Sequence, residues 1–199
     1  ITRYNVVPGL LGIILTMTMV MMTALAVTRE RERGTMENLL AMPVRPIEVM
    51  VGKIAPYIII GGIQVTVVLI AAKILFGVPF VGSFTLFGVA TLLFITVNLA
   101  LGFTFSTISQ NQLQAVQMSF FFLMPSILLS GFMFPREAMP FAARLVGNLL
   151  PLTYYLQLVR GIVLKGNGLL EVWPQALALA GFAVAFFTFA TRRFSKTLE

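Results

Sequence analysis

The sequence predicts an all-α integral membrane protein that crosses the bilayer about five times and forms a single transmembrane domain, residues 1–199. Charged residues make up only 11% of the chain, whereas soluble domains carry about 25%. Charge-free runs occupy residues 4–28, 74–135 and 172–191. Because a helix needs about 20 apolar residues to cross the hydrocarbon, the longest run has room for two crossings and a turn.

The spans are separated by recognisable breaks. Pro8 falls in the first turn of the first span, where a missing backbone N–H is tolerated. Glycine and proline in residues 77–83 separate the second span from the third. The polar link at residues 109–112 separates the third span from the fourth. The predicted spans are residues 6–27, 54–76, 84–107, 114–134 and 172–191.

Residues 135–171 are half apolar but contain several charges, and we expect them not to cross. The apolar pieces at 141–150 and 152–164 are each too short for a crossing, and Pro151 separates them. A crossing here would also place Arg144 or Arg160 in hydrocarbon, at a cost of about 2.5–3.5 kcal/mol. We therefore predict two short helices on the outer side that lie at, or dip into, one membrane face.

Basic residues orient the chain. One side of the membrane would carry Arg29, Arg31, Arg33, Arg45, Lys53, Arg192, Arg193 and Lys196. The other side would carry Arg3, Arg136, Arg144, Arg160 and Lys165, with Lys73 near the edge of the second span. Because cytoplasmic loops are enriched in basic residues, the first side, including the C-terminus, is predicted to be cytoplasmic. Lys73 is read as a lysine that reaches from the span towards the interface.

Composition excludes several functions. The net charge of +7 suits membrane-flanking residues, and no basic and aromatic face indicates nucleic-acid binding. The sequence contains no histidine and no cysteine, and no Gly-x-x-x-x-Gly-Lys-Ser/Thr loop that could hold ATP. We therefore predict no catalytic, metal or cofactor-binding residues, and a chain that is not itself an enzyme.

The segment between the first two spans, residues 28–53, is the most informative part of the chain. The first span is expected to continue as a helix through the alternating charges of residues 29–33, and Gly34 permits a break. Thr35 can cap a short amphipathic helix that Pro43 ends. Pro46 suits the first turn of the next helix. From composition alone, the short helix could be a simple interfacial anchor.

The pattern Glu32-Arg33-Gly34-Thr35-x-Glu37-x-Leu39-Leu40-x-x-Pro43 resembles the coupling segment of type-2 ABC exporter permeases, closest to the bacterial drug-export permeases. Ser130-Gly131-x-x-Phe134-Pro135 and, further on, Asn148-x-x-Pro151 and Arg160-Gly161 resemble the same family. The resemblance covers nearly the whole chain. It implies that the chain is a fragment that lacks the family's first span and extracytoplasmic domain.

The resemblance also implies a function and partners. The coupling helix would dock on a separate ATP-binding-cassette ATPase, which supplies the ATP chemistry, and a second permease chain would complete the pathway. The pair would export amphipathic, drug-like or lipid-like compounds across the bacterial inner membrane. The residues carried over to ATPase coupling are Glu30, Glu32, Arg33, Gly34, Thr35, Glu37, Leu39, Leu40 and Pro43.

Three polar residues within spans, Gln64, Asn98 and Gln117, are candidates for a substrate path. Structural hydrogen bonds between helices are the alternative explanation for them. Two other functions remain open at this point, an ion-coupled secondary transporter and a non-transporting membrane scaffold. The predicted spans contain no Asp, Glu or His that could relay a proton, which argues against the first. The coupling segment argues against the second.

Overall fold

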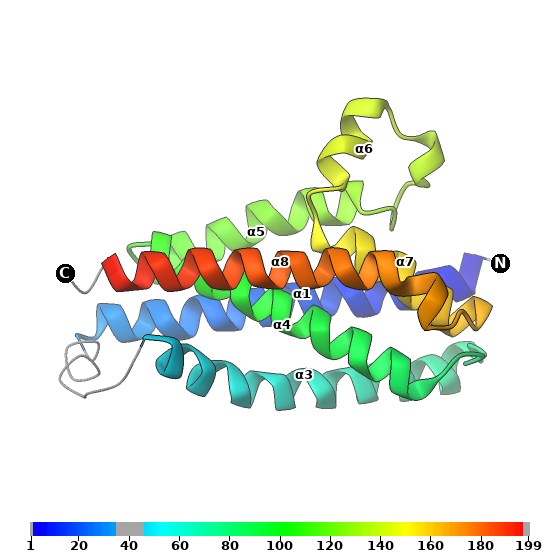
Figure 1. Ribbon diagram of the computed structural model, residues 1–199, viewed down its shortest axis with the longest axis horizontal. Coiled ribbons are helices and arrows are strands. Elements are labelled where there is room, and N and C mark those ends of the chain that lie inside the picture. Colours follow the sequence, from blue (N-terminus) through cyan, green and yellow to red (C-terminus); the bar gives the residue numbers. More distant parts are fainter. Residues whose placement is uncertain (1, 35–45, 197–199) are drawn as a thin grey trace.

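The computed structural model describes residues 2–34 and 46–196, and within them every regular element is a helix (Figure 1). The elements are α1 (Thr2–Glu32), α3 (Pro46–Phe76), α4 (Phe84–Ile108), α5 (Gln112–Leu129), the 3-10 helix η1 (Arg136–Ala138), α6 (Phe141–Gly147), α7 (Pro151–Lys165) and α8 (Leu169–Lys196). Of these, α1, α3, α4, α5 and α8 are long and apolar enough to cross a membrane. This confirms the predicted fold class and the five predicted spans.

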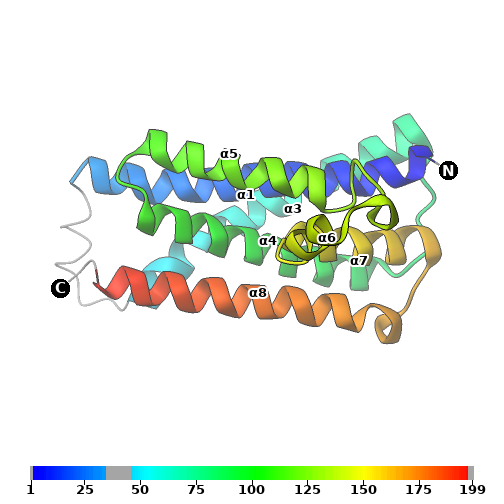
Figure 2. The ribbon, with the colours of Figure 1, turned by 90° about the horizontal axis from the view of Figure 1, so that it is seen from above.

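Helices α1 and α4 form the centre of the bundle. Helix α1 packs against α3, α4, α5 and α7, and α4 in turn packs against α8 (Figures 1 and 2). Contact between α1 and α4 is close because Gly102 has no side chain: a Cβ there would lie 2.5 Å from the carbonyl oxygen of Val20. The two helices therefore meet backbone to backbone, as is common between membrane helices.

The segment after α5 contains two separate short helices, α6 and α7, as predicted, and the break between them lies just before Pro151. Helix α7 begins at Pro151, which needs no N–H partner in a first turn. It is not a helix that lies on the bundle surface, because it packs against α1, α4 and α8 and buries Tyr155 and Leu156 completely. Tyr155 stacks on Phe94 of α4 with ring centroids 3.9 Å apart. Helix α7 is therefore packed inside the bundle, whereas the position of the two helices relative to the membrane face stays a prediction.

The end of α1 and the start of α3 agree with the turn signals in the sequence. Helix α1 extends through the charged residues to Glu32, Gly34 adopts a positive φ of 69°, and α3 begins at Pro46. The fourth span was predicted to reach residue 134, but α5 ends at Leu129. The prediction was wrong there because the sequence stays apolar, whereas Gly131 turns the backbone into the left-handed region with φ of 91°.

Candidate functional site

The ends of α1 and α3 that flank the predicted coupling helix lie together at one end of the bundle, where α8 also ends (Figures 1 and 2). Of the predicted coupling residues, Glu30, Glu32, Arg33 and Gly34 are described. The remaining ones, Thr35, Glu37, Leu39, Leu40 and Pro43, lie outside the described residues. The structure therefore describes the two helix ends between which the other predicted coupling residues lie in the sequence.

An ion pair joins the two helices that flank this segment. The Lys53 ammonium group, in the second turn of α3, contacts the Glu30 carboxylate near the end of α1. The two side chains are 17% and 36% exposed, so solvent screens the pair less than it would screen a pair on an open surface. The ion pair therefore links Glu30 of α1 to a different helix.

Glu32 holds the beginning of α5. One carboxylate oxygen accepts a hydrogen bond of 2.8 Å from the backbone N–H of Gln112, and the other accepts one from the Gln112 side-chain amide. Gln112 is the first residue of α5, whose leading N–H groups have no partner within the helix. A carboxylate at that position also complements the partial positive charge of the helix N-terminus. The last residue of α1 is thus fastened to α5.

Three further contacts join the end of α1 to the turn between α4 and α5. The Arg31 guanidinium donates to the carbonyl oxygen of Ser109 at 3.0 Å. The hydroxyls of Thr28 and Ser109, both fully buried, lie 3.2 Å apart. Arg29 Nε donates to the Gln112 side-chain oxygen at 3.5 Å. Together with the ion pair, these contacts join α1, α3, α4 and α5 at the base of the coupling segment. We call this set, Thr28, Arg29, Glu30, Arg31, Glu32, Lys53, Ser109 and Gln112, the base network.

Of the eight members of the base network, only Glu30 and Glu32 were predicted as site residues. The six that were missed are Thr28, Arg29, Arg31, Lys53, Ser109 and Gln112. A signal was present for Ser109 and Gln112, because residues 109–112 are four consecutive polar residues between predicted spans and on the same predicted side as the coupling segment. Lys53 is the last residue of the segment 28–53 that the sequence analysis singled out. The contact between Lys53 and Glu30 could not be predicted from the sequence, because only the packing of α3 against α1 brings the two side chains together.

The structure does not bring the three candidate substrate-path residues together. Gln64 of α3 accepts a hydrogen bond of 2.8 Å from Thr18 of α1, which joins two helices. Asn98 is buried and donates to the carbonyl oxygen of Phe94 within its own helix at 2.9 Å. Gln117 is exposed on α5. Gln64 therefore makes the bond between helices that was the alternative explanation, whereas the bond of Asn98 lies within α4.

At the opposite end of the bundle, two of the motif pieces quoted above meet. The Arg160 guanidinium of α7 donates to the carbonyl oxygen of Gly131 at 3.1 Å, across 29 positions of sequence. The Arg136 side chain donates to the Asn148 side-chain oxygen. A cavity of about 570 Å³ lies between these groups, lined also by Gln157 and Glu137. In the described part of the chain, no three histidine, cysteine or carboxylate side chains gather as a metal site would require.

Comparison with known proteins finds one family and several relatives. Residues 1–164 match the family described as ABC-2 type transporter. The chain is 37% identical over 198 residues to the inner membrane transport permease YhhJ of Escherichia coli (strain K12), a match that covers 96% of this chain and 52% of that protein. It is 33% identical over 187 residues to the probable multidrug ABC transporter permease YbhS of the same strain, covering 94% and 50% respectively.

A eukaryotic protein is also similar. ABC transporter G family member 20 of Dictyostelium discoideum is 28% identical over 179 residues, which is 89% of this chain and 24% of that protein. The chain spans about half the length of the two bacterial relatives. The similarity to all three extends over most of the described helices.

Proposed function

Because this chain belongs to the ABC-2 type transporter family, we propose that it forms the membrane pathway of an exporter for amphipathic compounds, driven by ATP hydrolysis in a separate ATPase subunit. As a permease it is a multi-pass membrane component of a transporter and not an enzyme. Two permease chains would enclose the substrate path and face two ATPases. Family membership favours this function over the ion-coupled transporter and the scaffold.

The observation that carries the mechanism is the base network. A coupling helix can transmit force only if both of its attachment points are held by the bundle. Here α1 and α3, which enter and leave the coupling segment, are joined to each other by Glu30 and Lys53. Glu32 and Arg31 fasten the same end of α1 to the turn between α4 and α5. Movement of the coupling segment would therefore displace four spans together.

The direction of transport rests on the predicted orientation. Arg29, Arg31, Lys53, Arg192 and Arg193 gather at the end that holds the base network. If basic residues mark the cytoplasmic side, the coupling segment faces the compartment where ATP is available. The substrate class rests on the resemblance to drug-export permeases and on the printed name of YbhS as a probable multidrug permease. Both are proposals for this chain.

Two substitutions in the coupling segment test the function. Glu37→Arg reverses a charge on the proposed docking face, and Leu39→Asp places a charge on its apolar face. Both should abolish transport and substrate-stimulated ATP hydrolysis while the amount of protein in the membrane stays normal. Glu137→Arg, the same charge reversal at the opposite end of the bundle, is the matched control and should leave coupling intact. If both test variants export at the normal rate and associate normally with the ATPase, the segment is only an interfacial anchor.

The orientation has its own test, which the absence of cysteine from this sequence makes clean. In intact cells an impermeant thiol reagent should label Lys165→Cys and should leave Lys196→Cys unlabelled. Labelling of Lys196→Cys from outside would show that the predicted orientation is wrong and that the coupling segment does not face the cytoplasm.

A further inference from the structure

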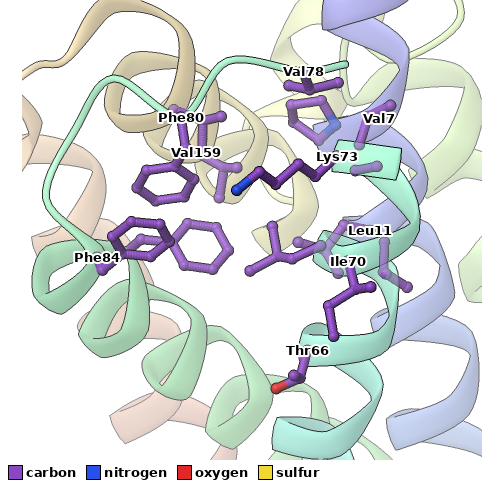
Figure 3. A pocket seen from close by; sticks show the side chains of 15 residues that line it. Val7, Leu11, Thr66, Ile70, Lys73, Val78, Phe80, Phe84 and Val159 are labelled. Carbon is purple, nitrogen blue, oxygen red and sulfur yellow. The ribbon is translucent and has the colours of Figure 1, made fainter. Parts of the chain in front are cut away.

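A cavity of about 420 Å³ opens on the side of the bundle between α1, α3, α4 and α7 (Figure 3). Its walls are apolar except for Thr66 and Lys73 of α3. Among the lining residues Ile70 is 54% exposed and Phe84 is 68% exposed. The cavity is therefore open at the surface of the described part of the bundle.

Lys73 sets the chemistry of this cavity. Figure 3 shows its side chain extending from α3 into the cavity, towards the side lined by Phe80. Phe80 stacks on Phe84 with centroids 3.9 Å apart and rings 2° from parallel, which forms a flat apolar wall. Within the described part of the chain, no carboxylate forms an ion pair with Lys73. The cavity thus combines one cation with apolar walls and supplies no counter-charge of its own.

The Lys73 side chain does not point where it would if its only role were to reach the membrane surface. It lies one turn before the end of α3, so its stem could extend past Phe76 and away from the bundle. Instead the side chain extends among the apolar residues that line the cavity. From Lys73 the lining continues along α3 to Thr66, about 10 Å at about 1.5 Å per residue. That length suits part of an acyl chain with its headgroup at the lysine.

We propose that this cavity binds a membrane phospholipid with an anionic headgroup, whose acyl chain lies along α3 and whose phosphate pairs with Lys73. The occupant is argued from charge complementarity. A neutral or zwitterionic headgroup leaves the lysine without a net counter-charge, whereas an anionic one supplies it. Anionic lipids gain about 1 kcal/mol for each nearby basic residue, which corresponds to about a fivefold preference.

Native mass spectrometry can test the proposal on the whole natural permease, purified with its ATPase. The protein is equilibrated with equal amounts of phosphatidylglycerol and phosphatidylethanolamine that carry the same acyl chains, and the retained lipids are counted. We expect about a fivefold preference for phosphatidylglycerol. Lys73→Gln should remove the preference and Lys73→Arg should keep it. Lys165→Gln, which removes the same charge from the neighbouring α7 end outside the cavity, should also keep it.

A second variant separates the cavity from the charge. Ile70→Trp fills the cavity from its exposed side and should reduce retention of both lipids without changing the fold. The proposal is overturned if Lys73→Gln keeps the preference. It is equally overturned if the unaltered protein retains neither lipid, as would happen if a segment outside the structure covered the cavity. The readout is lipid retention, so its result is independent of whether the coupling variants transport.

Discussion

The ion pair between Lys53 and Glu30 should contribute measurably to stability, and Lys53→Met is the perturbation that tests it. Methionine keeps an apolar stem of similar length and removes the charge. Exposed ion pairs contribute about 0.2–1 kcal/mol, whereas removing one partner of a buried pair costs about 3–5 kcal/mol. With side chains 17% and 36% exposed, this pair lies between those cases. We therefore expect the free energy of unfolding to fall by about 1–2 kcal/mol.

The assay is a double-mutant cycle of reversible unfolding in mixed micelles, with Glu30→Gln as the second substitution. If the pair is the interaction lost, Lys53→Met should cost much less when Glu30 is already glutamine. The matched control is Lys165→Met, which removes an exposed lysine at the opposite end of the bundle and should change stability by less than about 0.5 kcal/mol. Substrate-stimulated ATP hydrolysis should fall in the Lys53 variant and stay normal in the control.

Additive losses would refute the reasoning. If the two single substitutions add to within about 0.3–0.5 kcal/mol in the double variant, the carboxylate and the ammonium group do not interact in solution. The base network would then not join α3 to α1. If Lys53→Met also shows normal substrate-stimulated ATP hydrolysis, the ion pair has no part in the proposed mechanism.

Three other substitutions test separate parts of the structure. Gln112→Leu removes the side-chain hydrogen bond from Gln112 to Glu32, one of the two bonds that join α5 to the end of α1. Substrate-stimulated ATP hydrolysis should fall while the amount of protein in the membrane stays normal. An unchanged rate would contradict a role of this bond in coupling. Gly102→Ala places a Cβ against the backbone of α1 and should lower the free energy of unfolding by about 1–3 kcal/mol, whereas Gly88→Ala on the same helix enters open space and should not. Tyr155→Phe removes a 3.1 Å hydroxyl contact with α4 and keeps the ring stacking, so it should cost about 0.5–1.5 kcal/mol by the same unfolding measurement; a loss as large as that of Tyr155→Ala would show that the hydroxyl dominates.

The spans could be read from the sequence because crossing a membrane is a local requirement. A polar backbone in hydrocarbon must satisfy its hydrogen bonds within the helix, so about 20 apolar residues in a row are enough to predict a span. The ends of α1 and α3 also followed from local signals, Gly34 and Pro46. The end of α5 did not, since apolar residues continue past Gly131 and only the backbone conformation shows the turn.

The candidate site was predicted in part. The coupling motif directed attention to Glu30 and Glu32, and both belong to the base network. Their partners could not be predicted, because Gln112 is 80 positions from Glu32 and reaches it only through the packing of α5 on α1. The predicted substrate path had no such support. A polar residue in a span has the same sequence signature whether it binds substrate or bonds to a neighbouring helix, and Gln64 bonds to Thr18.

Sequence alone was therefore sufficient for the helical class, the five spans, the coupling motif and the family resemblance, since each depends on composition or on short-range order. Tertiary structure decided which helices are neighbours, and with that the pairing of Glu30 with Lys53 and the burial of α7. It also placed Lys73 in an apolar cavity built from four helices. The physical reason is that an apolar helix can span the membrane whichever apolar helices lie beside it. An ion pair, a hydrogen bond between helices or a cavity exists only where side chains from separate helices meet.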